Sequence, residues 1–165
     1  MSLATEITFY HLTKWPLERA LPKLLERALA QNHKVVVRVP NTDRLAAFNQ
    51  ALWTYDPGSF LPHGVARDGN SKHQPVYLTT GSDVPNEATL LILTGGTDSD
   101  DIGRFTRCFD IFEGDERSVV NAEKRWALRS VAGYSQTYWQ QAVDGRWEKC
   151  VKPEFSTLNP AKSAR

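Results

Sequence analysis

A glycine turn followed by acidic residues is the segment that comes closest to a ligand-binding motif. Residues 94–97 read Thr-Gly-Gly-Thr, and Asp98, Asp100 and Asp101 follow them. Backbone N–H groups of such a turn can bind an anion, and carboxylate oxygens can bind a divalent cation. Glycines and acids also form ordinary polar turns, however, and carboxylates repel phosphate when no metal is present. A nucleotide- or metal-binding enzyme that uses the loop after a strand ending near Leu93 is therefore our alternative hypothesis.

Other catalytic signatures are not found in the sequence. The four histidines are His11, His33, His63 and His73. No two of them have the i, i+4 spacing of helical metal ligands, and neither Cys108 nor Cys150 has a histidine nearby in sequence. The loop after the first predicted strand lacks the glycines of a P-loop or a dinucleotide fingerprint. We predict no catalytic residue, cofactor or metal, and two thiols without a disulfide.

A predicted helix at residues 116–132 concentrates positive charge. Its basic residues are Arg117, Lys124, Arg125 and Arg129. Only Glu123 opposes them between 117 and 129, although the whole chain has a net charge of +1. These cations can form a solvated face favoured by the helix dipole. Alternatively, they form a rim beside Trp126 that binds an acidic peptide carboxyl end, or a basic surface for single-stranded DNA, which the low net charge disfavours.

A second candidate surface follows a predicted helix that closes near Trp53. Residues 51–64 combine aromatic residues and prolines where the helix gives way to a loop. Aromatic side chains fill protein cores and also anchor protein interfaces. Trp53 and Phe60 can therefore pack inward or contact a partner, and the pattern does not decide between these roles.

Alternating strands and helices must position these residues. Hydrophobic periodicity predicts strands at 7–12, 34–39, 75–79, 89–94 and 105–112, and helices at 17–30, 42–53 and 116–132. Asp115 and Gly133 should cap the last helix. This alternation predicts a three-layer, Rossmann-like α/β domain with a mostly parallel sheet and helices on both faces. We place one domain at residues 1–145 and a partly disordered tail at 146–165.

Composition is that of a folded domain. The chain has 165 residues, of which 41% are hydrophobic and 24% are charged. Such a chain is long enough to bury one core. We find neither a secretory signal nor an apolar run of the roughly 20 residues that span a bilayer. We therefore expect a cytoplasmic protein that makes no membrane contact and is monomeric on its own.

Three segments, in their order and spacing, resemble the chi subunit family of bacterial DNA polymerase III. They are Phe9-Tyr10-His11-Leu12, Ala51-Leu52-Trp53 with Ser59-Phe60-Leu61-Pro62-His63, and Arg125-Trp126 with Val131-Ala132-Gly133-Tyr134. The resemblance covers roughly residues 7–140. It implies a fold of the nucleotide-binding or helicase type without an enzymatic role of its own. It also implies an accessory subunit of the clamp loader that acts in DNA replication.

The resemblance implies two partners, and contact with DNA only through them. The positions that contact the clamp-loader subunit psi, or its functional equivalent, match Trp53, Phe60 and Pro62. The acidic, Phe-ended tail of the single-stranded-DNA-binding protein is expected at a second surface.

That second surface matches Phe112 together with Arg125 and Trp126. Two basic positions of the family fall on Glu123 and Ala127 in this sequence. The neighbouring cations that can replace them are Arg117, Lys124 and Arg129.

Overall fold

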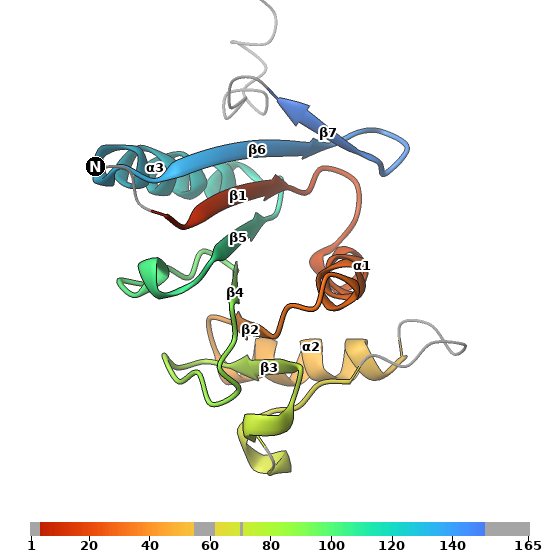
Figure 1. The fold of residues 1–165 in the computed structure, drawn as a ribbon. Coiled ribbons are helices and arrows are strands. Elements are labelled where there is room, and N and C mark those ends of the chain that lie inside the picture. Colours follow the sequence, from red (N-terminus) through yellow and green to blue (C-terminus); the bar gives the residue numbers. More distant parts are fainter. Residues whose placement is uncertain (1–3, 55–61, 70, 151–165) are drawn as a thin grey trace, which may run out of the picture.

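The computed structural model describes residues 4–54, 62–69 and 71–150, in which strands alternate with helices (Figure 1). The strands are β1 (Glu6–His11), β2 (Val35–Arg38), β3 (Val76–Thr79), β4 (Leu90–Thr94), β5 (Arg107–Phe112), β6 (Ser135–Gln141) and β7 (Trp147–Cys150). The α-helices are α1 (Leu17–Ala30), α2 (Thr42–Thr54) and α3 (Glu116–Ala132). Three short 3₁₀ helices are η1 (Ala66–Asp68), η2 (Ser71–His73) and η3 (Ile102–Arg104).

Within the described residues the strands form one sheet of seven, in the order β3-β2-β4-β5-β1-β6-β7. All neighbouring pairs are parallel except β6 and β7, which are antiparallel. β1 lies between β5 and β6, so His11 pairs with Phe112 on one side and Gln140 on the other. Parallel strands need crossover connections. α1, α2 and α3 lie in the connections that follow β1, β2 and β5, whereas the connection from β4 to β5 contains η3.

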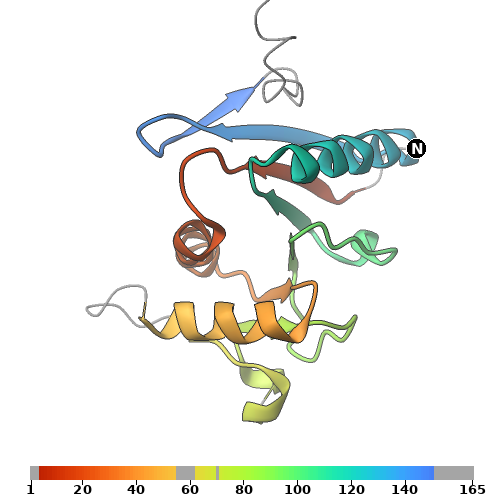
Figure 2. The ribbon, with the colours of Figure 1, turned by 180° about the vertical axis from the view of Figure 1, so that it is seen from behind.

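The helices cover opposite faces of the sheet, as the predicted three-layer fold requires. We call these the α1 face, which α1 and α2 cover, and the α3 face. Along β5, Phe109 and Ile111 join the α1-face core, whereas Cys108 and Phe112 join the α3-face core. This alternation follows from the period of two in a strand. Figure 2 shows α3 in front of β1 and β5, apart from α1.

The ends of α3 confirm the predicted caps. Asp115 is the N-cap, and its carboxylate accepts a hydrogen bond from the Ser118 backbone N–H. The helix ends at Gly133, whose φ of 97° is left-handed and therefore favours glycine. These caps fix where α3 begins and ends, and its buried residues Val119 and Ala122 mark the side that faces the sheet.

The sheet continues beyond the predicted strands. β6 carries mainly Ser, Gln and Thr, and only Tyr138 and Gln141 are buried along it, so it lacks the apolar pattern by which the other strands were predicted. β7 has only four residues and pairs with β6 at the sheet edge. The sheet thus passes the boundary expected at residue 145, and residues 151–165 of the predicted tail lie outside the described residues.

No helix within the described residues is both long enough and apolar enough to cross a membrane.

Candidate partner-binding surfaces

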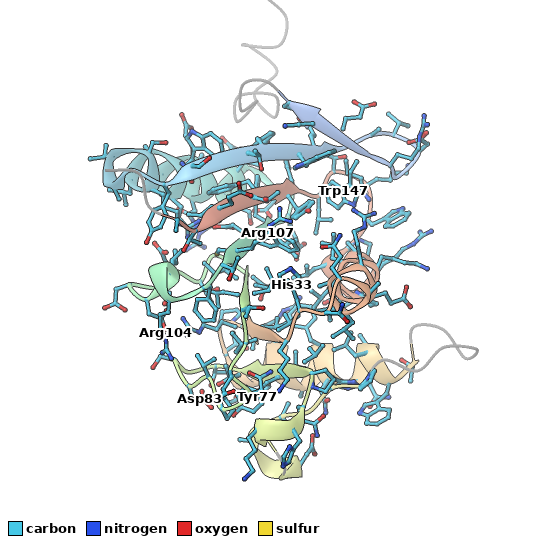
Figure 3. All side chains as sticks on the ribbon, viewed as in Figure 1. His33, Tyr77, Asp83, Arg104, Arg107 and Trp147 are labelled. Carbon is cyan, nitrogen blue, oxygen red and sulfur yellow. The ribbon has the colours of Figure 1, made fainter. Side chains whose placement is uncertain are left out.

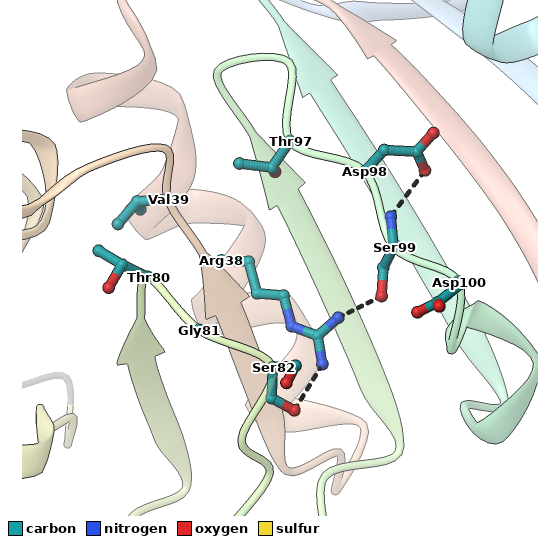
Figure 4. A pocket seen from close by; sticks show the side chains of 9 residues that line it. All are labelled: Arg38, Val39, Thr80, Gly81, Ser82, Thr97, Asp98, Ser99 and Asp100. Atoms are coloured by element: carbon teal, nitrogen blue, oxygen red, sulfur yellow. Dashed lines mark hydrogen bonds between the residues drawn. The ribbon is translucent and has the colours of Figure 1, made fainter.

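A cavity of about 600 Å³ lies at the carboxyl ends of β2, β3 and β4, where the glycine and acid segment ends β4 (Figure 4). Arg38 is buried at this cavity and points toward the loop after β4. Its Nη1 donates to Ser99 Oγ at 2.5 Å and to Asp101 Oδ1 at 2.7 Å, and its Nη2 donates to Asp101 Oδ2 at 2.9 Å. These bonds from Arg38 hold the pKa of Asp101 at about 2.

The chemistry of this cavity does not favour a phosphate ligand. Arg38 already pairs with Asp101, while Asp98 and Asp100 add carboxylates to the lining. Over residues 4–54, 62–69 and 71–150, no three His, Cys, Asp or Glu side chains gather as a metal site requires. The Arg38–Asp101 pair instead ties the loop after β4 to the end of β2. The nucleotide- or metal-binding enzyme remains a prediction without support from this lining.

Two of the predicted rim arginines on α3 point into the protein. Arg125 and Arg129 are only 6% and 5% exposed. Arg125 Nε donates to Asp110 Oδ2 at 2.7 Å and its Nη2 donates to Asp110 Oδ1 at 2.9 Å. Arg129 Nη1 donates to Asp110 Oδ2 at 2.7 Å, and its Nη2 donates to Asp98 at 2.8 Å. We call these four residues the Asp110 network.

The helical period explains this inward orientation. Residues four apart share a helix face, and residues 125 and 129 lie on the side of α3 that also buries Val119 and Ala122. That side meets the α3 face of β5, where Asp110 is 1% exposed. Burial lowers the pKa of Arg129, but the nearby carboxylates of Asp110 and Asp98 outweigh this effect and raise it. The two arginines therefore neutralise a buried carboxylate.

The predicted aromatic contacts of this surface also belong to the core. Phe112 is buried and Trp126 is partly buried, and both contact Phe9, with ring centroids 6.2 Å and 5.1 Å away. His11 stacks on Phe112 at 4.7 Å. A small hollow of about 80 Å³ is lined in part by Phe112 and Arg125. Phe112 and Trp126 mainly hold α3 against the sheet.

The outer side of α3 exposes apolar residues that the sequence analysis did not single out. Leu128 and Val131 are 68% and 89% exposed, and Val120 is also exposed. With the exposed Lys124, their spacing of three or four residues places them on one side of the helix. We call Val120, Lys124, Leu128 and Val131 the α3 stripe. The sequence contains a signal for this stripe: Val120, Leu128 and Val131 fall on a different side of the helix from the buried residues Val119 and Ala122.

The other predicted residues of α3 lie near this stripe. Arg117, Glu123 and Ala127 are all exposed. Of the predicted rim, Arg117 and Lys124 are thus the basic residues that face solvent, and they lie on the same helix as the exposed apolar side chains.

The second predicted surface lies at the end of α2. Trp53 is 54% exposed, and its ring centroid is 4.7 Å from that of His63. Pro62 is partly buried, whereas Phe60 lies outside the described residues. An apolar hollow of about 300 Å³ lies between α2 and the segment after His63. It is lined by Thr42, Leu45, Ala46, Asn49, Val65 and Ala66. Because α2 and α3 cover opposite faces, this surface and the α3 stripe can be occupied together.

Comparison with known proteins gives two matches. The family model described as DNA polymerase III chi subunit, HolC, matches residues 4–137. A probable DNA polymerase III subunit chi from Rickettsia prowazekii (strain Madrid E) is 30% identical over 93 residues. That alignment covers 56% of this chain and 56% of the relative, so it spans little more than half of either protein.

Proposed function

Because this chain belongs to the DNA polymerase III chi subunit family, we propose that it is a non-catalytic adaptor of the replication machinery. One surface binds a clamp-loader subunit, either psi or a functional equivalent. The other binds the acidic carboxyl-terminal tail of the single-stranded-DNA-binding protein. The adaptor thereby holds the clamp loader near protein-coated DNA, which raises its local concentration without new chemistry.

The observation that carries this proposal is the α3 stripe. An acidic peptide that ends in Phe needs apolar surface for its ring and cations for its carboxylates. The stripe combines exposed Leu128 and Val131 with Lys124, and Arg117 is exposed on the first turns of the same helix. Exposed apolar side chains grouped on one helix face are typical of interaction sites.

The inward arginines have an indirect role in this proposal. Arg125 and Arg129 connect α3 to Asp110 of the sheet. Phe112 of β5 and Trp126 of α3 pack between the helix and the sheet. They are positioning residues, whereas Arg117 and Lys124 supply the charges that contact the tail.

The clamp-loader subunit binds at the end of α2 in this proposal. Trp53 is large, aromatic and more than half exposed, which are properties of an interface anchor. Pro62 and the apolar hollow beside α2 extend the same surface. Phe60, which the resemblance also implies, would add a second aromatic anchor.

The first experiment titrates the protein with a fluorescent copy of the acidic tail from its own organism, and with a copy that lacks the final Phe. We expect binding that depends on the Phe. Lys124→Ala should weaken it about tenfold, or ~1.4 kcal/mol, through the loss of one charged contact. Arg19→Ala on α1 is the matched control. Binding that is absent at low salt, or equally strong in Lys124→Ala, would contradict this site.

The α2 surface is tested by capture of a purified clamp-loader subunit on the immobilised protein. Trp53→Ala should abolish capture while tail binding is retained, because the two surfaces lie on opposite faces. Loss of both activities would mean that the surfaces are not separate.

The enzyme alternative predicts that a nucleotide or Mg²⁺ raises the thermal midpoint, because ligands stabilise the folded state to which they bind. An adaptor without a cofactor should show no such shift. A shift that Asp101→Asn removes would favour the alternative.

A further inference from the structure

A basic pocket of about 200 Å³ lies on the α1 face and shares no lining residue with the hollow beside α2 or with the α3 stripe. The end of α1 forms one wall, and β1, β5 and β6 form the floor. The polar and aromatic residues that line it include Arg27, Arg107, Tyr10, Gln31, His33 and Trp139. Figure 3 shows Arg107 and His33 between the strands and α1. We call this cavity the Arg27–Arg107 pocket.

No carboxylate lines this pocket, in contrast to the cavity at Arg38. Across the part of the chain that the structure describes, neither Arg27 nor Arg107 forms an ion pair. Glu6 is opposite Arg107 in the strand register, but it is exposed and lies outside ion-pair distance. The two guanidinium groups thus have no negative partner in the described structure.

Arg107 is held in place with unused hydrogen-bonding capacity. Its Nε is buried without a hydrogen-bond partner among the described residues. Its Nη2 reaches only Thr8 Oγ1, at 3.4 Å, and its guanidinium lies 5.4 Å from the Phe109 ring centroid. A buried charged donor without an acceptor is unfavourable unless a ligand supplies one. This position is therefore suited to an incoming anion.

A phenol adds a further donor. Tyr10 is buried on the pocket floor, and burial raises its pKa, although the charges of Arg107 and Arg27 oppose that shift. The phenol is therefore protonated at neutral pH. The Tyr10 side chain and both guanidinium-bearing residues line the same pocket.

A flat apolar surface lies beside these donors. Trp139 is half-buried, and its indole makes no hydrogen bond or ring contact with another described residue. Lys149 lies directly opposite it on β7 and is exposed. Directly opposed residues share a face of the sheet, so Lys149 extends the basic surface past Trp139.

We propose that the Arg27–Arg107 pocket and the adjoining β6–β7 surface bind single-stranded nucleic acid, with a phosphate between the two arginines and a base against Trp139. Alternating cations and aromatic surfaces are the usual means of binding a single strand. The pocket is smaller than the ~300 Å³ at which small-molecule sites begin, so it suits one unit of a longer ligand. The low net charge of the chain does not oppose binding at this pocket, because no carboxylate lines it.

The test measures fluorescence anisotropy of a labelled oligothymidylate with the full chain at low salt, and quenching of tryptophan fluorescence by the unlabelled strand. We expect Arg27→Ala/Arg107→Ala to weaken binding at least tenfold. Because one phosphate loses its cationic contacts, the slope of log affinity against log salt should also flatten by about 0.7. Trp139→Leu should weaken binding and reduce the quenching.

The matched control removes two positive charges elsewhere, with Arg117→Ala/Lys124→Ala on α3. This variant should keep its oligonucleotide affinity within about twofold, because its charges lie on the other face. Glu6→Gln, which removes the carboxylate opposite Arg107, should tighten binding. Thermal midpoints establish that each variant is folded.

Three results would overturn the proposal: no binding by the unchanged protein at low salt, equal losses in the two double variants, or an acidic peptide whose binding depends on Arg27 and Arg107 and displaces the strand. The last result would assign the pocket to a peptide. Tail binding through Lys124 is measured separately, so either inference can fail without the other.

Discussion

Arginine side chains have opposite surroundings on the two faces of the sheet. On the α3 face, Arg125 and Arg129 are buried and share the carboxylate of Asp110. On the α1 face, Arg27 and Arg107 line a pocket without any carboxylate. The first pair neutralises a buried carboxylate of the fold, and we infer that the second pair is available to a ligand. Whether an arginine is available to bind a ligand thus depends on whether a carboxylate already pairs with it. Its position in a basic helix is a weaker indicator.

Of the changes that test this comparison, Asp110→Ala should lower the free energy of unfolding most. It leaves Arg125 and Arg129 buried without their shared carboxylate, and loss of one partner from a buried ion pair destabilises a protein by about 3–5 kcal/mol. Denaturant unfolding at neutral pH measures the change. If the variant were as stable as the unchanged chain, water would have to reach the network, and the two faces would not differ as described.

Burial of His11 on the α3 face predicts that the free energy of unfolding depends on pH. His11 is buried there, its Nδ1 is 2.5 Å from the Tyr138 hydroxyl oxygen, and burial lowers its pKa from 6.5 to about 4. Between pH 6.5 and pH 4 the unfolded chain therefore binds more protons at His11 than the folded chain does. His11 should lower the free energy of unfolding progressively as pH falls from 6.5 to 4, by about 3 kcal/mol in total.

Unfolding of the unchanged chain and of His11→Gln at pH 7 and pH 4.5 separates this contribution from those of the carboxylates. The variant should lose less stability over the interval. An identical loss in both proteins would show that His11 is not held neutral by the fold.

Replacing the three buried members of the Asp110 network, and leaving the half-exposed Asp98 in place, tests the comparison further. Asp110→Leu/Arg125→Met/Arg129→Met removes both signs of charge and keeps similar volumes, so no buried charge is left unpaired. Such replacements are often neutral or stabilising. We expect unfolding free energy within about 1 kcal/mol of the unchanged chain, far above that of Asp110→Ala. A triple variant as unstable as the single one would mean that the arginines position α3 in a way that apolar packing cannot replace.

Arg107→Ala should have the smallest effect on stability. Arg107 has no carboxylate partner in the described structure, and its contact with the Phe109 ring is worth only about 0.5–1 kcal/mol. A shift of the thermal midpoint larger than that of Arg125→Ala would reverse the comparison and assign Arg107 to the fold.

Most of the fold is encoded in local sequence patterns. α1 was predicted with the bounds that the structure has, and β2 and β4 lie within the predicted runs, because their apolar residues are buried on both faces. β6 was missed because it is polar and only partly covered. Its place in the sheet depends on pairing with β1, more than a hundred residues away in sequence, which no local pattern records.

The candidate surfaces were less predictable for the same reason. The basic character of α3 is visible in sequence, but the carboxylate that takes Arg125 and Arg129 inward lies on another element. For Trp53, the sequence did not decide between a place in the core and a place in an interface. Arg27 and Arg107 gave no signal at all, because α1 and β5 meet only in the folded chain.

The position of β1 has a consequence for the order in which the protein can form during synthesis. Residues 6–11 are synthesised before their hydrogen-bonding partners, residues 107–112 and 135–140. Until then the edges of β1 have no partners and its apolar residues no sheet to join. Because contacts between distant parts of a chain also slow folding, the nascent strand should need protection from other chains until residues 107–140 have been synthesised.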